Sequence, residues 1–258
     1  MTRPLEFKTI SAIDPDIPAS WQDKVFLTFD IDWASDAVLN HTLDLVEAAG
    51  VCSTWFITHP TPFLDRLLAN EQVEVGLHPN LNHFFEVPNP KAATLEETLD
   101  SLHNLAPKAR VVRSHSLVQS SRLSACFERM GFTHECNTFV PVSSGVSLKP
   151  WRQSHKPIQV PHGWEDDVAV TDHPQITPDA YLDQVARQQG LAVLDFHPIH
   201  VALNTEDLAR YERARPAHQD WTALQDHRFE GYGTASWLTD LIRLTTKQPA
   251  LTGSGGGR

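Results

Sequence analysis

The chain has 258 residues, 41% of them hydrophobic and 21% charged, so it can bury a large core and is globular, most simply as one domain. Its net charge of −11 argues against a nucleic-acid backbone or an anionic membrane surface as the main partner. We expect no membrane span, and the first residues lack the apolar segment of a signal peptide, so we expect a cytoplasmic protein. The three cysteines lack Cys-x-x-Cys spacing and indicate buried thiols in a reducing compartment.

Residues 1–23 are rich in proline and aspartate, and we expect them to lie on the surface. A single catalytic domain is expected over residues 24–250. The glycine-rich residues 251–258 are expected to form a flexible tail.

Strands and helices are predicted to alternate. Apolar and β-branched runs predict strands at 24–32, 51–58, 72–77, 110–113, 132–135 and 191–196. Helical patterns predict helices at 35–49, 62–69, 94–105, 121–130, 177–189, 205–213 and 235–246, and residues 137–161 are expected to be irregular. Because the connections are too long for hairpins, this α/β order favours parallel strands in a closed or nearly closed barrel, with an open doubly wound sheet as the alternative.

Chemically reactive side chains are placed at the ends of these strands. They are Asp30 and Asp32 after the first strand, His59 after the second, His78 after the third, Arg113 and His115 after the fourth, and His197 after the last. The carboxyl ends of parallel barrel strands meet on one face. The sequence therefore predicts a single site there.

The first two residues of this set are carboxylates. Asp30 and Asp32 are two apart in a strand, so they can share a face, where they would repel unless a cation, a proton or an arginine is near. A divalent metal on one carboxylate, with the other as a base, is one solution, and helix caps or turns are the alternative. His78 is a candidate metal ligand or a turn residue before Pro79, and His83 is a second ligand or an ordinary loop residue.

The remaining candidate site residues could each have more than one role. His115 could be a ligand, a substrate contact or a structural residue, and His197 is the best candidate acid, with Asp195 placed to orient a ring. Arg113 would offset the carboxylate repulsion. Candidate substrate-binding residues, each with a structural alternative, are Trp33, His59, Asn80, Trp164, Asp166 and His200.

Four stretches together resemble a known family. They are Leu27-Thr-Phe-Asp-Ile-Asp32, Glu74-Val-Gly-Leu-His78 with His83, Val112-Arg113, and Gly190-Leu-Ala-Val-Leu-Asp-Phe-His197. In this order they resemble the motifs of the polysaccharide deacetylase (NodB-homology) family, carbohydrate esterase family four, and most closely its WbmS-like branch, which is associated with O-antigen and other surface-polysaccharide clusters. The resemblance implies a distorted (β/α)7-type barrel, one divalent metal ion, commonly zinc, held by Asp-His-His, and removal of an N- or O-acyl group from a sugar or polysaccharide precursor.

Carried over by position, the resemblance makes Asp30 the base, Asp32 and His78 metal ligands, Arg113 the tether of the base, and His197 the acid. Three departures matter. The usual Asp-Asp-Gly is Asp-Ile-Asp here, the usual His-x-x-x-His becomes His78 with His83 five residues on, and Arg-x-Pro becomes Arg-Ser-His. The third ligand therefore stays open between His83 and His115.

Two other functions fit the same residues. One is a metal amidohydrolase acting on a small non-sugar amide, imide or ureide. The other is a non-catalytic carbohydrate-binding protein built on the same barrel.

Overall fold

The computed structural model describes residues 5–85, 94–153, 157–172 and 176–246. In these ranges all the strands pair in parallel, in the order β7-β6-β5-β4-β3-β2-β9-β8, with β1 beside the first part of β2. The strands are β1 (Glu6–Phe7), β2 (Lys24–Asp30), β3 (Ser53–Ile57), β4 (Val73–Leu77), β5 (Val111–Val112), β6 (His134–Glu135), β7 (Ile158–Gln159), β8 (Trp164–Glu165) and β9 (Ala192–Phe196).

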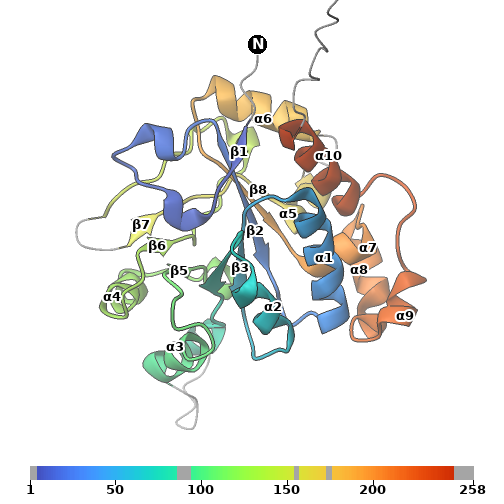
Figure 1. The fold of residues 1–258 in the computed structure, drawn as a ribbon, viewed down its shortest axis with the longest axis horizontal. Coiled ribbons are helices and arrows are strands. Elements are labelled where there is room, and N and C mark those ends of the chain that lie inside the picture. Colours follow the sequence, from blue (N-terminus) through green and yellow to red (C-terminus); the bar gives the residue numbers. More distant parts are fainter. Residues whose placement is uncertain (1–4, 86–93, 154–156, 173–175, 247–258) are drawn as a thin grey trace, which may run out of the picture.

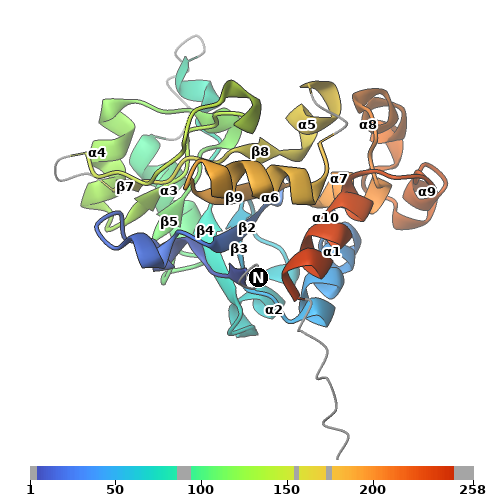
Figure 2. The same cartoon turned by 90° about the horizontal axis from the view of Figure 1, so that it is seen from above.

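Helices surround these strands, from α4 through α3, α2, α1 and α10 to α6 (Figure 1). Seen from above, α7, α8 and α9 lie together on the side of α1 and α10 (Figure 2). The helices are α1 (Asp36–Ala49), α2 (Phe63–Ala69), α3 (Leu95–His103), α4 (Ser121–Arg129), α5 (Asp166–Asp172), α6 (Pro178–Arg187), α7 (Pro198–Leu203), α8 (Leu208–Ala214), α9 (Trp221–Gln225) and α10 (Thr234–Thr246). Among the described helices, none is both long and apolar enough to cross a membrane.

The sheet is curled almost into a barrel. Strands β7 and β8 are at opposite ends of the strand order, yet only residues 160–163 separate them in the chain. Such a link spans at most about 18 Å, whereas a flat sheet of this order would hold the two strands about 34 Å apart. An isolated parallel bridge between Phe139 and His162 lies in the same gap. The predicted parallel barrel is confirmed, and the open doubly wound alternative is wrong.

Local sequence signals explain the helix ends that were predicted well. Helix α1 ends at Gly50, whose φ of +63° is the left-handed conformation that glycine adopts without strain. Helix α3 begins with a capping box in which the side chains of Thr94 and Glu97 bond each other's backbone N–H groups. Strands β7 and β8 and helices α5, α7 and α9 were not predicted, because elements this short show no clear period.

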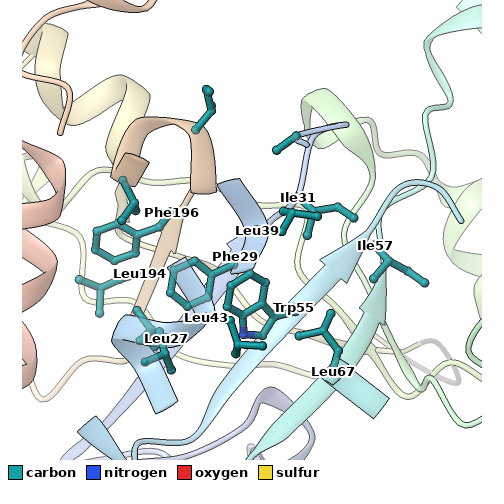
Figure 3. Packing of buried hydrophobic residues seen from close by; sticks show 14 of the residues in the cluster. Leu27, Phe29, Ile31, Leu39, Leu43, Trp55, Ile57, Leu67, Leu194 and Phe196 are labelled. Atoms are coloured by element: carbon teal, nitrogen blue, oxygen red, sulfur yellow. The ribbon is translucent and has the colours of Figure 1, made fainter. Parts of the chain in front are cut away.

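Alternation along β2 divides the interior into two cores. Leu27 and Phe29 face the helices, where Phe29 stacks on Trp55 at 4.3 Å between ring centroids and Leu39 and Leu43 of α1 complete the packing (Figure 3). The intervening residues Phe26, Thr28 and Asp30 point the other way, into the barrel. Phe26 belongs to a second apolar cluster, and the two polar residues above it lead toward the carboxyl ends of the strands.

The N-terminal segment closes the other end of the barrel. Ile10, Ile13 and Trp21 are at most 4% exposed and belong to the inner apolar cluster. The backbone N–H of Ile10 donates to Thr54 Oγ1 (3.1 Å), and His134 Nε2 lies 2.9 Å from the carbonyl oxygen of Ile13. The expectation that residues 1–23 lie on the surface is therefore wrong for these side chains, since they are buried in one cluster with inward-facing strand residues such as Phe26. The predicted tail, 251–258, lies outside the described residues.

Candidate active site

A buried arginine sits inside the barrel below the carboxyl ends of the strands. Arg113, the residue after β5, is 0% exposed and donates from Nη1 to Asp30 Oδ1 (3.0 Å) and to Asp195 of β9. Its Nη2 donates to Thr28 Oγ1 (3.0 Å). Sequence reasoning missed Thr28, although its position two residues before Asp30 in a strand was a signal that it faces the same way.

The charges in this layer stabilise one another. Burial alone would lower the pKa of Arg113, but the carboxylates of Asp195 and Asp30 outweigh burial and raise it. The guanidinium therefore remains charged between two carboxyl groups that water cannot reach, although burial outweighs its charge at Asp195 and raises the pKa of that group. It also packs over the ring of Phe56, 4.5 Å from the ring centroid. This layer holds Asp30 in place beneath the residues that follow.

Three ligand atoms form a nearly equilateral triangle above this layer. His78 Nε2 lies 3.2 Å from Asp32 Oδ1, His115 Nδ1 lies 3.3 Å from the same oxygen, and the two ring nitrogens are 3.3 Å apart. His78 follows β4, His115 follows β5, and Asp32 lies two residues beyond β2. The ends of β2, β4 and β5 thus deliver one carboxylate and two imidazoles to one point, across the end of the intervening strand β3.

The triangle fits a divalent metal ion. Zinc–ligand distances of about 2.0–2.1 Å in a tetrahedron place the ligand atoms about 3.3–3.4 Å apart, close to the spacing found here. Burial opposes a charge on His78, but Asp30 and Asp32 outweigh burial and raise its pKa. The site therefore favours added positive charge, which a divalent ion supplies.

Two further groups of three bring ligand atoms together in the described chain, and both contain His197. Three of their four carboxylates, all but that of Asp167, already have partners. Asp30 and Asp195 are bonded to Arg113, and Asp166 is bonded to His197 itself. The triangle of Asp32, His78 and His115 is therefore the best candidate for the metal.

Asp30 lies behind one of these ligands. Its Oδ2 is 3.4 Å from His78 Nδ1, on the opposite side of the ring from the nitrogen that faces Asp32. The two groups form an ion pair and no hydrogen bond at this distance. A carboxylate that hydrogen-bonds the outer nitrogen of a metal-binding imidazole fixes its orientation and strengthens it as a ligand, and Asp30 is on the side from which it could do so. Asp30 is only 3% exposed, so its contacts are with Arg113 and His78 rather than with open solvent.

A second histidine–carboxylate pair borders the triangle. Asp166, the first residue of α5, accepts from the backbone N–H of His197 (2.8 Å) and lies 2.7 Å from its Nδ1. This leaves His197 Nε2 directed toward Asp32 Oδ2, 3.7 Å away. Burial would lower the pKa of His197, but the charge and hydrogen bonds of Asp166 raise it well above its usual value. The arrangement holds a proton on the nitrogen nearest the triangle.

Three predicted residues lie outside the triangle. His83 is in a short helical turn, Asn82–Phe85, where the centroid of its ring lies 3.9 Å from that of Phe84. It contributes no atom to the groups of converging ligands. His59 pairs through Nδ1 with Thr58 Oγ1 at 2.7 Å. Asn80 accepts from the backbone N–H of Asn82. All three therefore make local contacts within their own loops.

The other predicted substrate contacts differ in exposure. Trp33 is 40% exposed and lies edge-on to the ring of His115, with 5.0 Å between centroids. Trp164 is 5% exposed and stacks on Trp237 in the apolar cluster between the sheet and the helices, so it has little surface with which to contact a substrate. His200 is buried one turn after His197 and bonds Thr205 Oγ1 through Nδ1 (3.0 Å).

Known proteins resemble both the sequence and the fold. A family model of WbmS-like polysaccharide deacetylases matches residues 27–215. The crystal structure of a candidate polysaccharide deacetylase of O-antigen biosynthesis from Bordetella bronchiseptica matches with 42% identity and a TM-score of 0.86, over 93% of this chain and 98% of that one. This match confirms the expected NodB-homology-like (β/α)7 barrel.

More distant structures match weakly. A carbohydrate esterase family four pseudoenzyme from Bacillus anthracis has 17% identity and a TM-score of 0.38, over 81% of this chain and 62% of its own. A peptidoglycan deacetylase from Bacillus subtilis has 17% identity and a TM-score of 0.37, over 90% and 94%. No curated protein matches the chain.

Proposed function

The chain belongs to the WbmS-like family of polysaccharide deacetylases, and we propose that it is a metal-dependent hydrolase. Its proposed substrate is a sugar of a surface-polysaccharide (O-antigen) precursor, from which it removes an N-acetyl or similar acyl group. The observation that carries this proposal is the triangle of Asp32, His78 and His115 with the His197–Asp166 pair beside it. Acyl hydrolysis needs a Lewis acid to polarise the carbonyl and an acid to protonate the leaving group, and these residues provide the ligands for the first and a protonated imidazole for the second.

Asp32, His78 and His115 would hold the ion, which we propose to be zinc, and His115 would take the place that the resemblance left open. A divalent ion held there would act as a Lewis acid toward the acyl carbonyl and lower the pKa of water toward about 7. Within the protein, Asp30 lies 3.4 Å from His78 Nδ1, where it would orient the ring, and Arg113 holds Asp30 in place. The role of base that the resemblance gives to Asp30 stays a prediction.

His197 is the proposed acid. Asp166 accepts from Nδ1, so the proton on Nε2 faces the region above Asp32, where the departing amine or alcohol would lie. Donating that proton neutralises the leaving group as the carbon–nitrogen or carbon–oxygen bond breaks. Asp166 then keeps the imidazole in the tautomer that can be protonated again.

Release of acetate from N- and O-acetylated sugars tests the function. The native protein, the protein after chelation, and the chelated protein reloaded with zinc would be compared, with cyclic imides and ureides as the rival substrates. We expect acetate from the sugars only, lost on chelation and restored by zinc. Turnover of imides alone would support the amidohydrolase, and sugar binding without any turnover would support the non-catalytic alternative. Action in the cytoplasm stays a prediction.

Asp30→Asn distinguishes the two roles of Asp30. If Asp30 positions His78, the variant should bind metal about 10–100-fold more weakly. If Asp30 is only the base, metal affinity should be unchanged while turnover falls. The zinc affinity of both proteins, measured by competition with a chelating dye, gives the answer.

A further inference from the structure

Strained backbone is concentrated beside two of the proposed metal ligands. Seven non-glycine residues have positive φ in the described ranges, and four of them form two consecutive pairs. Asp32 (+36°) and Trp33 (+56°) are one pair, and Ser116 (+57°) and Leu117 (+53°), directly after His115, are the other. A bulky side chain at positive φ is a clear outlier, and such strain persists where the surrounding structure enforces it, commonly at functional sites.

Trp33 is the bulkiest of these residues, and its backbone is held from both sides. Its N–H donates to Thr58 Oγ1 (3.4 Å), and its carbonyl oxygen accepts from Gln219 Nε2 (3.1 Å). These contacts come from the β3 end and from the segment between α8 and α9, so separate parts of the barrel enforce the conformation. Glycine would adopt this backbone conformation without strain. A tryptophan at this position therefore indicates that the indole has a functional role that outweighs the strain.

The indole is well placed to meet a substrate. It lies edge-on to His115, follows Asp32 directly in the chain, and remains 40% exposed. It therefore touches one proposed ligand and presents apolar surface next to the triangle. Tryptophan offers a large, rigid apolar surface with little conformational freedom to lose, which suits the apolar C–H face of a pyranose ring.

We propose that Trp33 is the platform on which the acylated sugar ring stacks, so that it determines specificity for sugars over other acyl compounds. This inference rests on the proposed function, because it places the sugar at the same metal site. It assigns Trp33 to substrate binding and positioning, and no proton or electron passes through it. The consequence is that removal of the indole should weaken sugar recognition more than it slows acyl hydrolysis that needs no sugar.

Sugar affinity tests the platform directly. In a His197→Ala background, which blocks turnover, zinc-loaded protein would be titrated calorimetrically with N-acetylglucosamine, N-acetylgalactosamine and tri-N-acetylchitotriose. Trp33→Ala should weaken binding about tenfold, equivalent to about 1.4 kcal/mol, and Trp33→Phe should weaken it less. The matched control is Trp151→Ala, since Trp151 is equally exposed (41%) but lies beside Arg152, which pairs with Asp14 of the N-terminal segment.

Turnover separates this inference from the proposed function. In the otherwise native protein, Trp33→Ala should lower kcat/KM for the acetylated sugar, chiefly through KM, by a larger factor than it lowers kcat/KM for 4-nitrophenyl acetate, which has no sugar ring to stack. An equal fall for both substrates, unchanged sugar affinity in Trp33→Ala, or no sugar binding by wild type would overturn the platform. If wild type binds sugars through Trp33 but hydrolyses none, the proposed function fails and the platform stands.

A stability comparison tests the strain independently of any ligand. Trp33→Gly and Trp33→Ala remove the same indole and differ by one methyl group at a φ of +56°. After chelation, the glycine variant should melt about 2–4 °C higher than the alanine variant, the reverse of the usual order. An alanine variant that is equally or more stable would show that Trp33 is not strained.

Discussion

Replacing Arg113 by methionine removes the cation that bonds both Asp30 and Asp195. The arginine side chain is fully buried, and the two carboxylates are at most 4% exposed, so water cannot take its place. Removing one partner of a buried ion pair costs about 3–5 kcal/mol. We therefore expect Arg113→Met to lower the free energy of unfolding at pH 7 by about that amount, measured by urea denaturation followed by circular dichroism.

Two companion measurements make this prediction specific. Arg113→Met/Asp195→Asn should recover part of the loss, because only one buried carboxylate then lacks a partner. The loss should also shrink from pH 7 to pH 5, since unpaired buried carboxylates take up protons in the folded protein before they do so in the unfolded chain. Arg129→Met, which breaks an exposed pair with Glu96, is the control and should change little. A loss below about 1 kcal/mol, or no recovery in the double variant, would refute this account of the polar layer.

Three further changes test other parts of the site and its support. His197→Ala should lower kcat about 10²–10⁴-fold with unchanged metal content, and loss of metal would contradict its role as acid. Burial and then the charge of Arg113 lower the pKa of His162 to about 3. As the pH falls, His162 is therefore protonated in the unfolded chain before it is protonated in the folded protein. The stability that its neutral form contributes above pH 6.5 is lost as the pH falls toward 3. His162→Gln should therefore lose about 2 kcal/mol less than wild type between pH 7 and pH 5; an identical pH profile in urea unfolding would count against it. Gly76→Ala would place a Cβ 2.7 Å from the ring of Phe56 and should destabilise by about 1–3 kcal/mol, whereas a neutral effect on the melting temperature would show that the ring can move.

Much of the site could be predicted because it follows from strand topology. In a parallel barrel, a residue just after one strand lies near the residues just after its neighbours. The reactive residues after the strands now numbered β2, β4, β5 and β9 were therefore expected to meet. The structure places Asp32 of the first, His78 of the second and His115 of the third within 3.3 Å of one another, with His197 of the last nearby.

What could not be predicted depends on short-range geometry. Spacing alone did not separate His83 from His115, because the choice depends on how the loop after β4 turns. Trp164 was expected near the substrate, but its pairing with Leu194 in the sheet register turns it to the helix side. A shift of one residue in a strand reverses the face on which a side chain lies, and a strand of two residues shows no alternation from which to read it.

The burial of the N-terminal segment was missed for a related reason. Its proline and aspartate residues resemble those of a surface loop, whereas the apolar residues that enter the barrel are widely spaced along it. Their burial depends on an opening at the strand starts, and local patterning carries no information about that opening. Such tertiary effects become visible only when the strands are in place.

Metal content of the wild type, His115→Ala and His83→Ala tests the central claim most directly. Elemental analysis after gentle purification and reloading with zinc should find about one equivalent in the wild type and in His83→Ala, and a large loss in His115→Ala. Metal retained in His115→Ala but lost in His83→Ala would show that the triangle found here is not the metal site. A wild type that binds no metal after reloading would contradict the proposed hydrolase itself.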